Sequence, residues 1–422
     1  MFGKMKKTVF VFGAGSTSAL GLPTSEEQMA FFEKIDPKEE PMLGKLTAIL
    51  AHYFGKDGEG HFHCGINDVF NLIDSNLLLH NGLYCEKNKI EFFELEECKK
   101  EVIRFLFSHF LKKIKENQEN DADYRAYVDF YYQLAKAEIE HALKHGVDEN
   151  DRSTFISRYS IINFNWDLYS LLPIFEANAK LNHENGHYFP IRRNPNLRIF
   201  TDFNCEYASK GKKDEVWYPF TEPAAHIVNS EKYESARRVV LTKCYYPHGA
   251  MNLFKCPNCA KHSYFLGDLT VESVARSLNF ESKKKTEKLY NCPHCSSEIR
   301  HYDFDILPQS NFKTRNAYLE SVRLSMINEL RNADRLFFIG YSMPTDDVDN
   351  ITLLKSLNHV KEVYVTLYDK NGENKFLDDS KLNVKNEAVE RFHDCFRNKE
   401  KVLFNMAGVP TAFDEILKIY KE

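Results

Sequence analysis

The sequence lacks any long apolar run. Its 422 residues contain no stretch near the roughly 18 consecutive apolar residues that a membrane-spanning helix needs. The opening segment, MFGKMKKTVFVFGAG, has an apolar part of only Val9 to Phe12, which is too short for the core of a secretory signal peptide. We therefore expect a first β-strand there, no association with membranes, and a cytoplasmic protein.

The sequence also lacks a surplus of charge of one sign. The formal net charge is −5, from 56 Lys and Arg residues against 61 Asp and Glu residues. This balance argues against a protein that binds nucleic acid mainly by electrostatic attraction. Hydrophobic residues make up 43% of the chain, without internal repeats or low-complexity linkers. Such a chain is typical of a globular protein, built as one large domain with insertions or as two to three units.

Apolar, strand-like segments alternate with helical ones along much of the chain. Strands are predicted within residues 6–15, at the start of 158–172, over 237–256, at the start of 333–350 and at the start of 360–374. Strands separated by helices favour an open parallel sheet. The predicted fold class is α/β: a Rossmann-like parallel sheet with a large helical insertion and a small four-cysteine zinc-ribbon module.

The predicted domain organisation divides the chain into three parts. Residues 1–40, 151–253 and 301–422 form the Rossmann-like domain, residues 41–150 the helical insertion, and residues 254–300 the zinc-ribbon module. Aromatic side chains recur at helical spacing within the insertion. This pattern favours core packing over a ligand site, and an oligomer interface is the alternative.

Four of the ten cysteines form two C-x-x-C pairs, Cys256–Cys259 and Cys292–Cys295, separated by residues 260–291. Two such thiolate pairs make a tetrahedral Zn²⁺ site, and four protein ligands leave no position open for catalysis. The sequence therefore predicts a structural zinc site with these four ligands and an arm of chain that protrudes between the pairs. The cysteines expected to be buried and reduced are Cys64, Cys85, Cys98, Cys205, Cys244 and Cys395.

A glycine loop, VFGAGSTSALGLPTSEE, includes the end of the first predicted strand. Gly13, Ala14 and Gly15 would let backbone amides approach a pyrophosphate, and a following helix, capped by Thr24 or Ser25, would add the dipole of its N-terminus. The loop lacks the Lys-Ser/Thr pair of a P-loop, so an ATPase has little support. Taken alone, the loop is compatible with a dinucleotide site and with an ordinary tight turn between a strand and a helix.

Polar residues also end two other predicted strands. Asn165 and Asp167 lie at the carboxyl end of a strand, the edge at which open α/β sheets bind ligands. They could hold a water or ribose hydroxyls, or they could cap the next helix. His248 and Gly249 lie on a constrained loop just before the first cysteine pair. A lone histidine is more often an ordinary core or surface residue. The constrained loop makes a functional role for His248 more plausible.

In this order, the motifs resemble the pattern of the sirtuin family, from residue 8 to about residue 375. The matching residues are Gly13-Ala14-Gly15, Gly21-Leu22-Pro23, Asn165-Trp166-Asp167, His248-Gly249, the four paired cysteines and Gly340-Tyr341-Ser342. The resemblance implies a Rossmann-like domain, a zinc-bearing small domain and NAD⁺ in the cleft between them. The common chemistry of the family is cleavage of the bond between nicotinamide and ribose.

The resemblance also implies roles for single residues. The residues that it assigns to the dinucleotide are Gly13, Ala14, Gly15 and Thr17 at the pyrophosphate, Gly340 and Ser342 at the adenosine half, Asp369 at the adenine ribose, and Pro23 as a further cofactor-binding residue. The catalytic residues that it assigns are Asn165 and Asp167 beside the nicotinamide ribose and His248 as the base. The metal ligands are the four paired cysteines.

Departures from the deacylating members of the family sharpen the predicted activity. After Gly-Leu-Pro those members continue with Asp-Phe-Arg, whereas this chain has Thr24-Ser25-Glu26. Before Asn-x-Asp they carry Thr-Gln, whereas this chain has Asn163-Phe164. A clear Phe-Gly-Glu segment for peptide binding is missing after the cysteines. These departures argue against binding of an acyl-lysine peptide and leave the residues of the NAD⁺ pocket mostly in place.

The helical insertion and the segment GYSMPTDD resemble the sirtuin-like NAD⁺ hydrolase effectors of bacterial antiphage defence systems. The resemblance implies hydrolysis of NAD⁺, as substrate, to ADP-ribose and nicotinamide, which starves an infected cell. It also implies a homo-oligomer with a partner that senses infection, such as a ring-shaped DNA-translocase ATPase, and no direct nucleic-acid binding. The alternatives are an NAD⁺-dependent protein deacylase and a catalytically silent sensor of NAD⁺ or ADP-ribose.

Overall fold

The structure is a computed structural model. The residues that it describes are 6–24, 27–116, 121–145, 155–188, 197–205, 208–209, 216–217, 219–229, 238–266, 274, 290–299, 303–308, 310, 315–345, 347–382, 386–396 and 401–422. Within this part of the chain, no helix is both long and apolar enough to cross a membrane.

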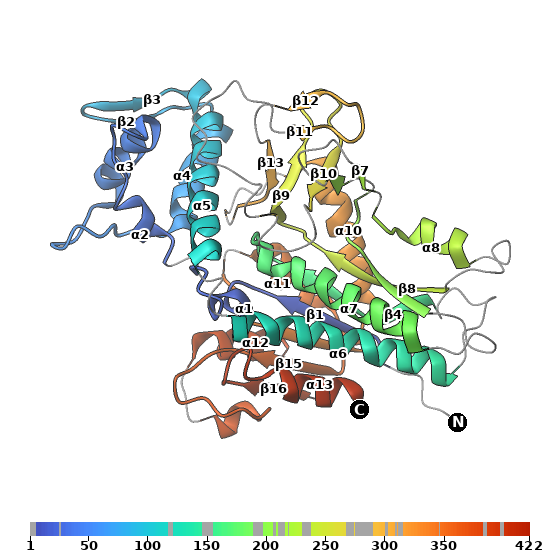
Figure 1. The fold of residues 1–422 in the computed structure, drawn as a ribbon. Helices are drawn as coiled ribbons and strands as arrows, with labels where there is room; N and C mark the ends of the chain where they lie inside the picture. Colours follow the sequence, from blue (N-terminus) through green and yellow to red (C-terminus); the bar gives the residue numbers. More distant parts are fainter. Residues whose placement is uncertain are drawn as a thin grey trace.

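A seven-stranded parallel sheet forms the centre of the described fold (Figure 1), in the order β16-β15-β14-β1-β4-β8-β5. Its strands are β1 (Thr8–Phe12), β4 (Ile156–Asn163), β5 (Leu197–Asp202), β8 (Arg238–Tyr245), β14 (Arg335–Ile339), β15 (Glu362–Thr366) and β16 (Lys401–Asn405). Every neighbouring pair is parallel. From β1 the chain first builds the side that starts with β4 and later the side that starts with β14. The strand order therefore reverses between β1 and β14, and the sheet confirms the predicted parallel α/β fold.

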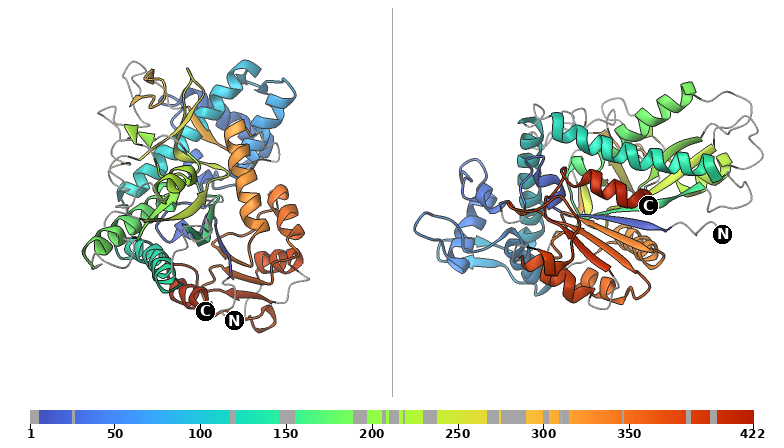
Figure 2. Two further views of the ribbon diagram at one scale, coloured as in Figure 1. Left: turned by 90° about the vertical axis from the view of Figure 1, so that its right-hand side faces the viewer. Right: turned by 90° about the horizontal axis from the view of Figure 1, so that it is seen from below.

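Helices cover both faces of this sheet (Figure 2). The helices of one face are α6 (Asp121–His145), α7 (Leu172–Tyr188) and α13 (Phe413–Lys421). Those of the other face are α10 (Ala317–Arg331), α11 (Val348–Ser356) and α12 (Glu387–Cys395), with α8 (Glu222–Asn229) against β8. Side chains of a strand alternate between faces, so Phe10 belongs to the first core and Val9 and Val11 to the second. All five residues of β1 are buried, as in strands covered on both sides.

A buried ion pair joins α6 to the sheet. Arg158 of β4 donates hydrogen bonds to the carboxylate of Glu138 from its backbone N–H, at 2.7 Å, and from Nε, at 2.9 Å. Tyr420 of α13 donates its hydroxyl to the same carboxylate. Because Glu138 is buried, these donors replace the water that the charged group loses on folding.

A group of helices lies beside the sheet, at the left of Figure 1. Its elements are α2 (Met29–Phe32), α3 (Pro41–Phe54), α4 (Ile66–Leu78), the hairpin of β2 (Leu83–Cys85) and β3 (Asn88–Ile90), η1 (Phe92–Glu94) and α5 (Leu95–Glu116). The short helix α1 (Gly15–Ser18) follows β1 at the edge of the sheet. The sequence predicts helix throughout residues 41–145, so the hairpin is a correction. The helix expected from Thr24 is also shorter than predicted: Thr24 and Glu27 form a hydrogen-bonded turn, and α2 begins only at Met29. Ser25, the other expected cap, lies outside the described residues.

A second, five-stranded sheet was not predicted. Its order is β13-β9-β10-β6-β7, with β6 (Ala208–Ser209), β7 (Val216–Trp217), β9 (Gly249–Lys255), β10 (His262–Phe265) and β13 (Phe304–Ile306). A separate pair, β11 (Tyr290–Asn291) and β12 (Glu298–Ile299), lies near it at the top of Figure 1. The turns between β9 and β10 and between β11 and β12 carry the paired cysteines. The protruding arm expected between the pairs falls largely outside the described residues.

Replacing Glu138 by Ala should lower the free energy of unfolding by about 3 kcal/mol, because the Arg158 guanidinium would lose its buried counter-charge. Denaturant titration followed by circular dichroism measures this change. Glu140→Ala is the matched control, since Glu140 lies on the same helix and is exposed. Equal stability of the two variants would contradict the role given to the ion pair.

Candidate functional site

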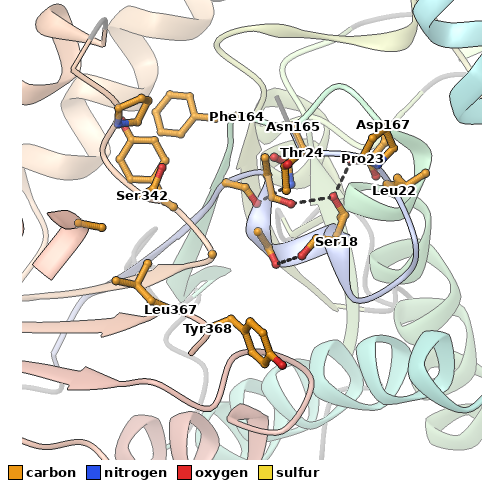
Figure 3. Close-up of a pocket in the computed structure, with 18 of the residues that line it drawn as sticks. Ser18, Leu22, Pro23, Thr24, Phe164, Asn165, Asp167, Ser342, Leu367 and Tyr368 are labelled. Atoms are coloured by element: carbon orange, nitrogen blue, oxygen red, sulfur yellow. Dashed lines mark hydrogen bonds between the residues drawn. The ribbon is translucent and has the colours of Figure 1, made fainter. Parts of the chain in front are cut away.

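A cavity of about 730 Å³ opens at the carboxyl edge of the parallel sheet. The segments that line it follow β1, β4, β8, β14, β15 and β16, and further walls come from α4, α5 and α12. Figure 3 shows the side chains of Asn165 and Asp167 on one side of this space and those of Ser342, Leu367 and Tyr368 on the other. The cavity therefore spans the point at which the strand order reverses, where open α/β sheets bind ligands.

Two glycine turns touch each other at the centre of this edge. The N–H of Gly15 donates to the carbonyl oxygen of Gly340 at 2.9 Å, and the N–H of Gly13 donates to Ile339 at 3.1 Å. Gly340 has a φ of +61°, and a Cβ atom there would lie 2.1 Å from the backbone nitrogen of Ser16. A side chain at Gly340 would therefore collide with the first turn, so the contact requires glycine.

The amide groups of the first turn are largely occupied within the protein. The N–H groups of Gly13 and Gly15 are used in the contacts just described. The N–H of Ser16 donates to the carbonyl oxygen of Gly13 at 2.8 Å, and the N–H of Thr17 donates to that of Ala14 at 3.2 Å. These bonds fix the shape of the turn. They also leave fewer N–H donors for a pyrophosphate than the sequence suggests.

Asn165 is held against the first glycine turn. Its amide nitrogen donates to the carbonyl oxygen of Gly13 and to the hydroxyl of Ser16, both at 3.0 Å. Since a carbonyl can only accept, this contact also fixes which end of the amide is nitrogen. Asn163 accepts a hydrogen bond from the backbone of Asn165 at 2.9 Å and so shapes the same turn. The carbonyl oxygen of Asn165 is the atom that the side chain can offer to a ligand.

Asp167 is buried beside the same turn, where its carboxylate accepts a hydrogen bond from the hydroxyl of Thr17 at 3.0 Å. Tyr127 of α6 donates its hydroxyl to the carbonyl oxygen of Ser16. Burial raises the pKa of Tyr127, and the charge of Asp167 raises it further, so this hydroxyl stays protonated and keeps donating. Tyr127 is a contact of the turn that sequence reasoning missed.

His248 lies at the cavity on a loop that its neighbour fixes. Gly249 has a φ of +74°, and a Cβ atom there would lie 1.9 Å from the carbonyl oxygen of Asp305. The imidazole ring of His248 packs against Phe164, with ring centroids 4.9 Å apart. Phe164 in turn stacks on Tyr341 at 5.2 Å. The ring of Phe164 thus connects the histidine to the second glycine turn.

The structure brings nearly all predicted site residues to this one cavity. The predicted residues that line it are Gly13, Ala14, Gly15, Thr17, Pro23, Asn165, Asp167, His248, Gly340 and Ser342. Asp369 is not among the lining residues, although Leu367 and Tyr368 are. Its carboxylate accepts a hydrogen bond from the N–H of Asn371 at 2.9 Å, within a tight turn. The roles assigned to all these residues stay predictions.

Other lining residues were not predicted as site residues from the sequence. Phe164 and Tyr341 act through ring contacts, and the Tyr341 hydroxyl donates to Asp347 at 2.5 Å. Arg391 of α12 reaches the second glycine turn and donates to the carbonyl oxygen of Ser342 at 3.2 Å. Gln28 also lines the cavity. Only the tertiary fold brings these residues to the site, although Tyr341 directly follows a glycine that the sequence singles out.

The paired cysteines form a separate cluster. Cys256 and Cys259 lie in the turn between β9 and β10, and Cys292 and Cys295 lie in the turn between β11 and β12. The two turns have the same backbone form. In each, the residue after the second cysteine has a positive φ, 57° at Ala260 and 60° at Ser296, and its N–H donates to the carbonyl oxygen of the first cysteine at 2.9 Å.

The cluster has the dimensions of a tetrahedral zinc site. The four Sγ atoms lie within 4.8 Å of one another, with 3.8 Å between those of Cys256 and Cys295 and 3.7 Å between those of Cys259 and Cys292. Zn–S bonds of about 2.3 Å in a tetrahedron place sulfur atoms about 3.8 Å apart. The residues therefore fit Zn²⁺ as the sequence predicts.

The remaining cysteines differ in burial. Cys98, Cys205, Cys244 and Cys395 are buried, as expected. Cys64 and Cys85 are only partly buried, which corrects the expectation for these two.

The fold and the site define an α/β protein with a ligand cavity at the switch point of its parallel sheet and a four-cysteine cluster compatible with zinc. No protein-family model matches the chain, and no curated protein matches it. Among solved structures, it is similar to a structure described as giving the basis for the mechanism and regulation of Sir2 enzymes. The two share 12% identity over 99% of this chain and 94% of the other, with a TM-score of 0.32.

The chain is also similar to a Sir2 homolog solved as a complex with NAD. Here the identity is 11%, the coverage 99% of this chain and 90% of the other, and the TM-score 0.31. At this level of similarity, the function has to be argued from the chain's own residues.

The purified protein should contain about one equivalent of Zn²⁺, and Cys292→Ser should lose most of it, because three thiolates hold the ion less well than four. Elemental analysis after dialysis measures the metal. Cys85→Ser is the control, since Cys85 lies outside the cluster. A wild-type protein without zinc, or a Cys292→Ser variant with the full amount, would contradict the site.

Gly340→Ala should destabilise the protein by about 2 kcal/mol or more, because the new Cβ atom would overlap the backbone of Ser16. Thermal or denaturant unfolding measures the loss. Gly58→Ala is the control, since a Cβ atom at Gly58 would meet nothing within 4 Å. If both variants unfold like the wild type, the contact between the two turns is less tight than described.

Proposed function

We propose that the protein hydrolyses NAD⁺ to ADP-ribose and nicotinamide. The observation that carries this proposal is the convergence of Asn165, Asp167 and His248 with two glycine turns on one cavity. A cavity of about 730 Å³ lies in the size range of sites for cofactors. The resemblance of the ordered motifs to the sirtuin family supports NAD⁺ as the ligand, and the likeness of the two glycine turns to a dinucleotide-binding edge agrees with it.

The dinucleotide would lie across the glycine turns. Its pyrophosphate would rest against the turn that includes Gly13 and Thr17, and its adenosine half would extend past Gly340 and Ser342. Its nicotinamide ribose would lie beside Asn165 and Asp167, on the side of the cavity where Figure 3 places these two side chains together.

The cleavage step needs little acid catalysis, because nicotinamide leaves the cationic dinucleotide as a neutral molecule. Positive charge then develops at C1′ of the ribose, and the buried carboxylate of Asp167 is suited to stabilise it. The carbonyl oxygen of Asn165, whose amide hydrogens are already used, can accept a hydrogen bond from the attacking water or the 2′-hydroxyl. His248 would accept the proton, directly or through a hydroxyl.

Two features favour water over an acyl-lysine peptide as the nucleophile. The first is Phe164, which stands where deacylating sirtuins carry Gln and whose bulky ring contacts the imidazole of His248 and stacks on Tyr341. The turn of Thr24 and Glu27 replaces a segment that deacylating sirtuins use. Both features support hydrolysis, and the peptide-dependent reaction is the alternative outcome of the experiment below.

We also propose a cellular role, based on the resemblance to antiphage effectors. An uncontrolled NAD⁺ hydrolase would deplete its own cell, so the enzyme would act in the cytoplasm as a homo-oligomer under the control of a partner. That partner would sense infection, as a ring-shaped DNA-translocase ATPase could. Exposed apolar side chains of the helical insertion, among them Leu78, Leu79 and Phe93, support an interface there.

Purified protein incubated with NAD⁺ should release nicotinamide without any peptide, and Asn165→Ala or His248→Ala should lower the turnover by about 10²-fold or more. Chromatography of nicotinamide and ADP-ribose gives the rates. His52→Ala, a change at an exposed histidine, is the control and should keep full activity.

Normal turnover in both variants would remove the proposed catalytic roles. Release that strictly requires an acetyl-lysine peptide would identify a deacylase instead. Tight binding of NAD⁺ without release, in the presence of the native partner, would identify a sensor.

A further inference from the structure

The peptide unit between Ser16 and Thr17 connects to both side chains that the proposed reaction places beside the nicotinamide ribose. The hydroxyl of Ser16 accepts a hydrogen bond from the amide of Asn165 at 3.0 Å. The hydroxyl of Thr17 donates to the carboxylate of Asp167 at 3.0 Å. All four residues are buried, so bulk solvent does not compete for either contact. The position of this one peptide unit therefore sets where Asn165 and Asp167 stand.

The carbonyl group of that peptide unit is bound from outside the turn. Its oxygen, which belongs to Ser16, accepts a hydrogen bond from the hydroxyl of Tyr127 on α6, 111 residues further along the chain. Tyr127 is 1% exposed, and its hydroxyl is the polar atom of the side chain. A buried acceptor that loses its donor is unfavourable. The hydroxyl of Tyr127 thus ties the peptide unit to α6.

Ring contacts fix Tyr127 in turn. Phe413, at the start of α13, packs against the ring of Tyr127 at a right angle, with ring centroids 4.9 Å apart. Phe413 also stacks on Phe130 of α6 at 4.3 Å. Phe130 contacts Phe10 of β1 at 6.0 Å, and the glycine turn follows β1 directly. The hydroxyl of Tyr127 is therefore held in a fixed place relative to the strand from which the turn starts.

Tyr127 is not among the described residues that line the cavity, so its effect on a bound dinucleotide has to pass through the turn. We propose, on the basis of the proposed function, that Tyr127 is a positioning residue for the cleavage of NAD⁺. It fixes the peptide unit between Ser16 and Thr17. Through that unit it holds the carbonyl oxygen of Asn165 and the carboxylate of Asp167 in place against the ribose. Displacing such groups by about 1 Å can cost a large part of the rate.

Tyr127→Phe removes the hydroxyl and keeps the ring contacts. It should lower kcat for nicotinamide release from NAD⁺ by about tenfold, the size of one hydrogen bond between neutral groups, and change KM less. Steady-state kinetics of the full-length protein, with its native partner present, measures both constants. Tyr132→Phe is the matched control, since it also removes a hydroxyl of α6, one that donates to Glu184, and it should keep the wild-type kcat.

A double-mutant cycle separates positioning from a general loss of stability. If Tyr127 acts through the turn, Tyr127→Phe should lower kcat clearly less when Asn165 is already replaced by Ala. A general loss of stability would lower kcat by the same factor in both backgrounds. Ser16→Ala removes the hydroxyl that accepts from Asn165 and should also lower kcat. This variant keeps the proposal testable if Tyr127→Phe fails to fold.

Three results would each overturn the positioning role and leave NAD⁺ hydrolysis standing. They are a folded Tyr127→Phe variant with the wild-type kcat, equal losses in the two backgrounds of the cycle, and a Ser16→Ala variant with the wild-type kcat. A wild-type protein that releases no nicotinamide with its native partner present would overturn both the hydrolase and the role of Tyr127. The two failures are therefore distinguishable.

Discussion

The contact between the two glycine turns is the constraint on which the rest of the site depends. Gly340 can lie against the backbone of Gly15 and Ser16 because it carries no Cβ atom, and this brings the carboxyl ends of β1 and β14 together. The two halves of the sheet meet there, so the cavity can extend over both. Asn165 and Tyr127 then fasten to the first turn, and Phe164 and Arg391 fasten to the second.

Much of the sheet and most of the site follow from local signals. Apolar strands that end in glycine or in Asn-x-Asp can be identified from a few neighbouring residues. Parallel pairing then brings the ends of these strands to one edge of the sheet. The same kind of reasoning was less successful where a neighbour decides the structure. The expected helix after Pro23 gave way to the turn of Thr24 and Glu27, and α2 is held by packing on α5. The edge strand Leu197–Asp202, LRIFTD, does not alternate regularly between apolar and polar residues, and it was missed.

The cavity contains residues that no local pattern could identify. Phe164 and Arg391 come from separate parts of the chain, and each contributes through a contact that exists only in the folded protein. Asp369 illustrates the opposite case. The residues that follow it favour a tight turn, and its carboxylate takes part in that turn, whereas the sequence predicts that it contacts the adenine ribose. The segment Asp369 to Gly372 is typical of a turn, and the carboxylate binds the backbone of that turn. A strand-end aspartate is therefore a weaker signal when glycine and asparagine follow it closely.

Strand β9 begins one residue after His248 and ends one residue before Cys256. An extended strand of this length spans roughly 20 Å, which is too far for a metal ion in the cluster to polarise anything in the cavity. The cysteine cluster and the histidine are nevertheless the two ends of one hydrogen-bonded element. The cluster can therefore influence the site only through the backbone of β9. By fixing the end of β9 at Cys256, it helps to fix the position of the His248 ring at the other end.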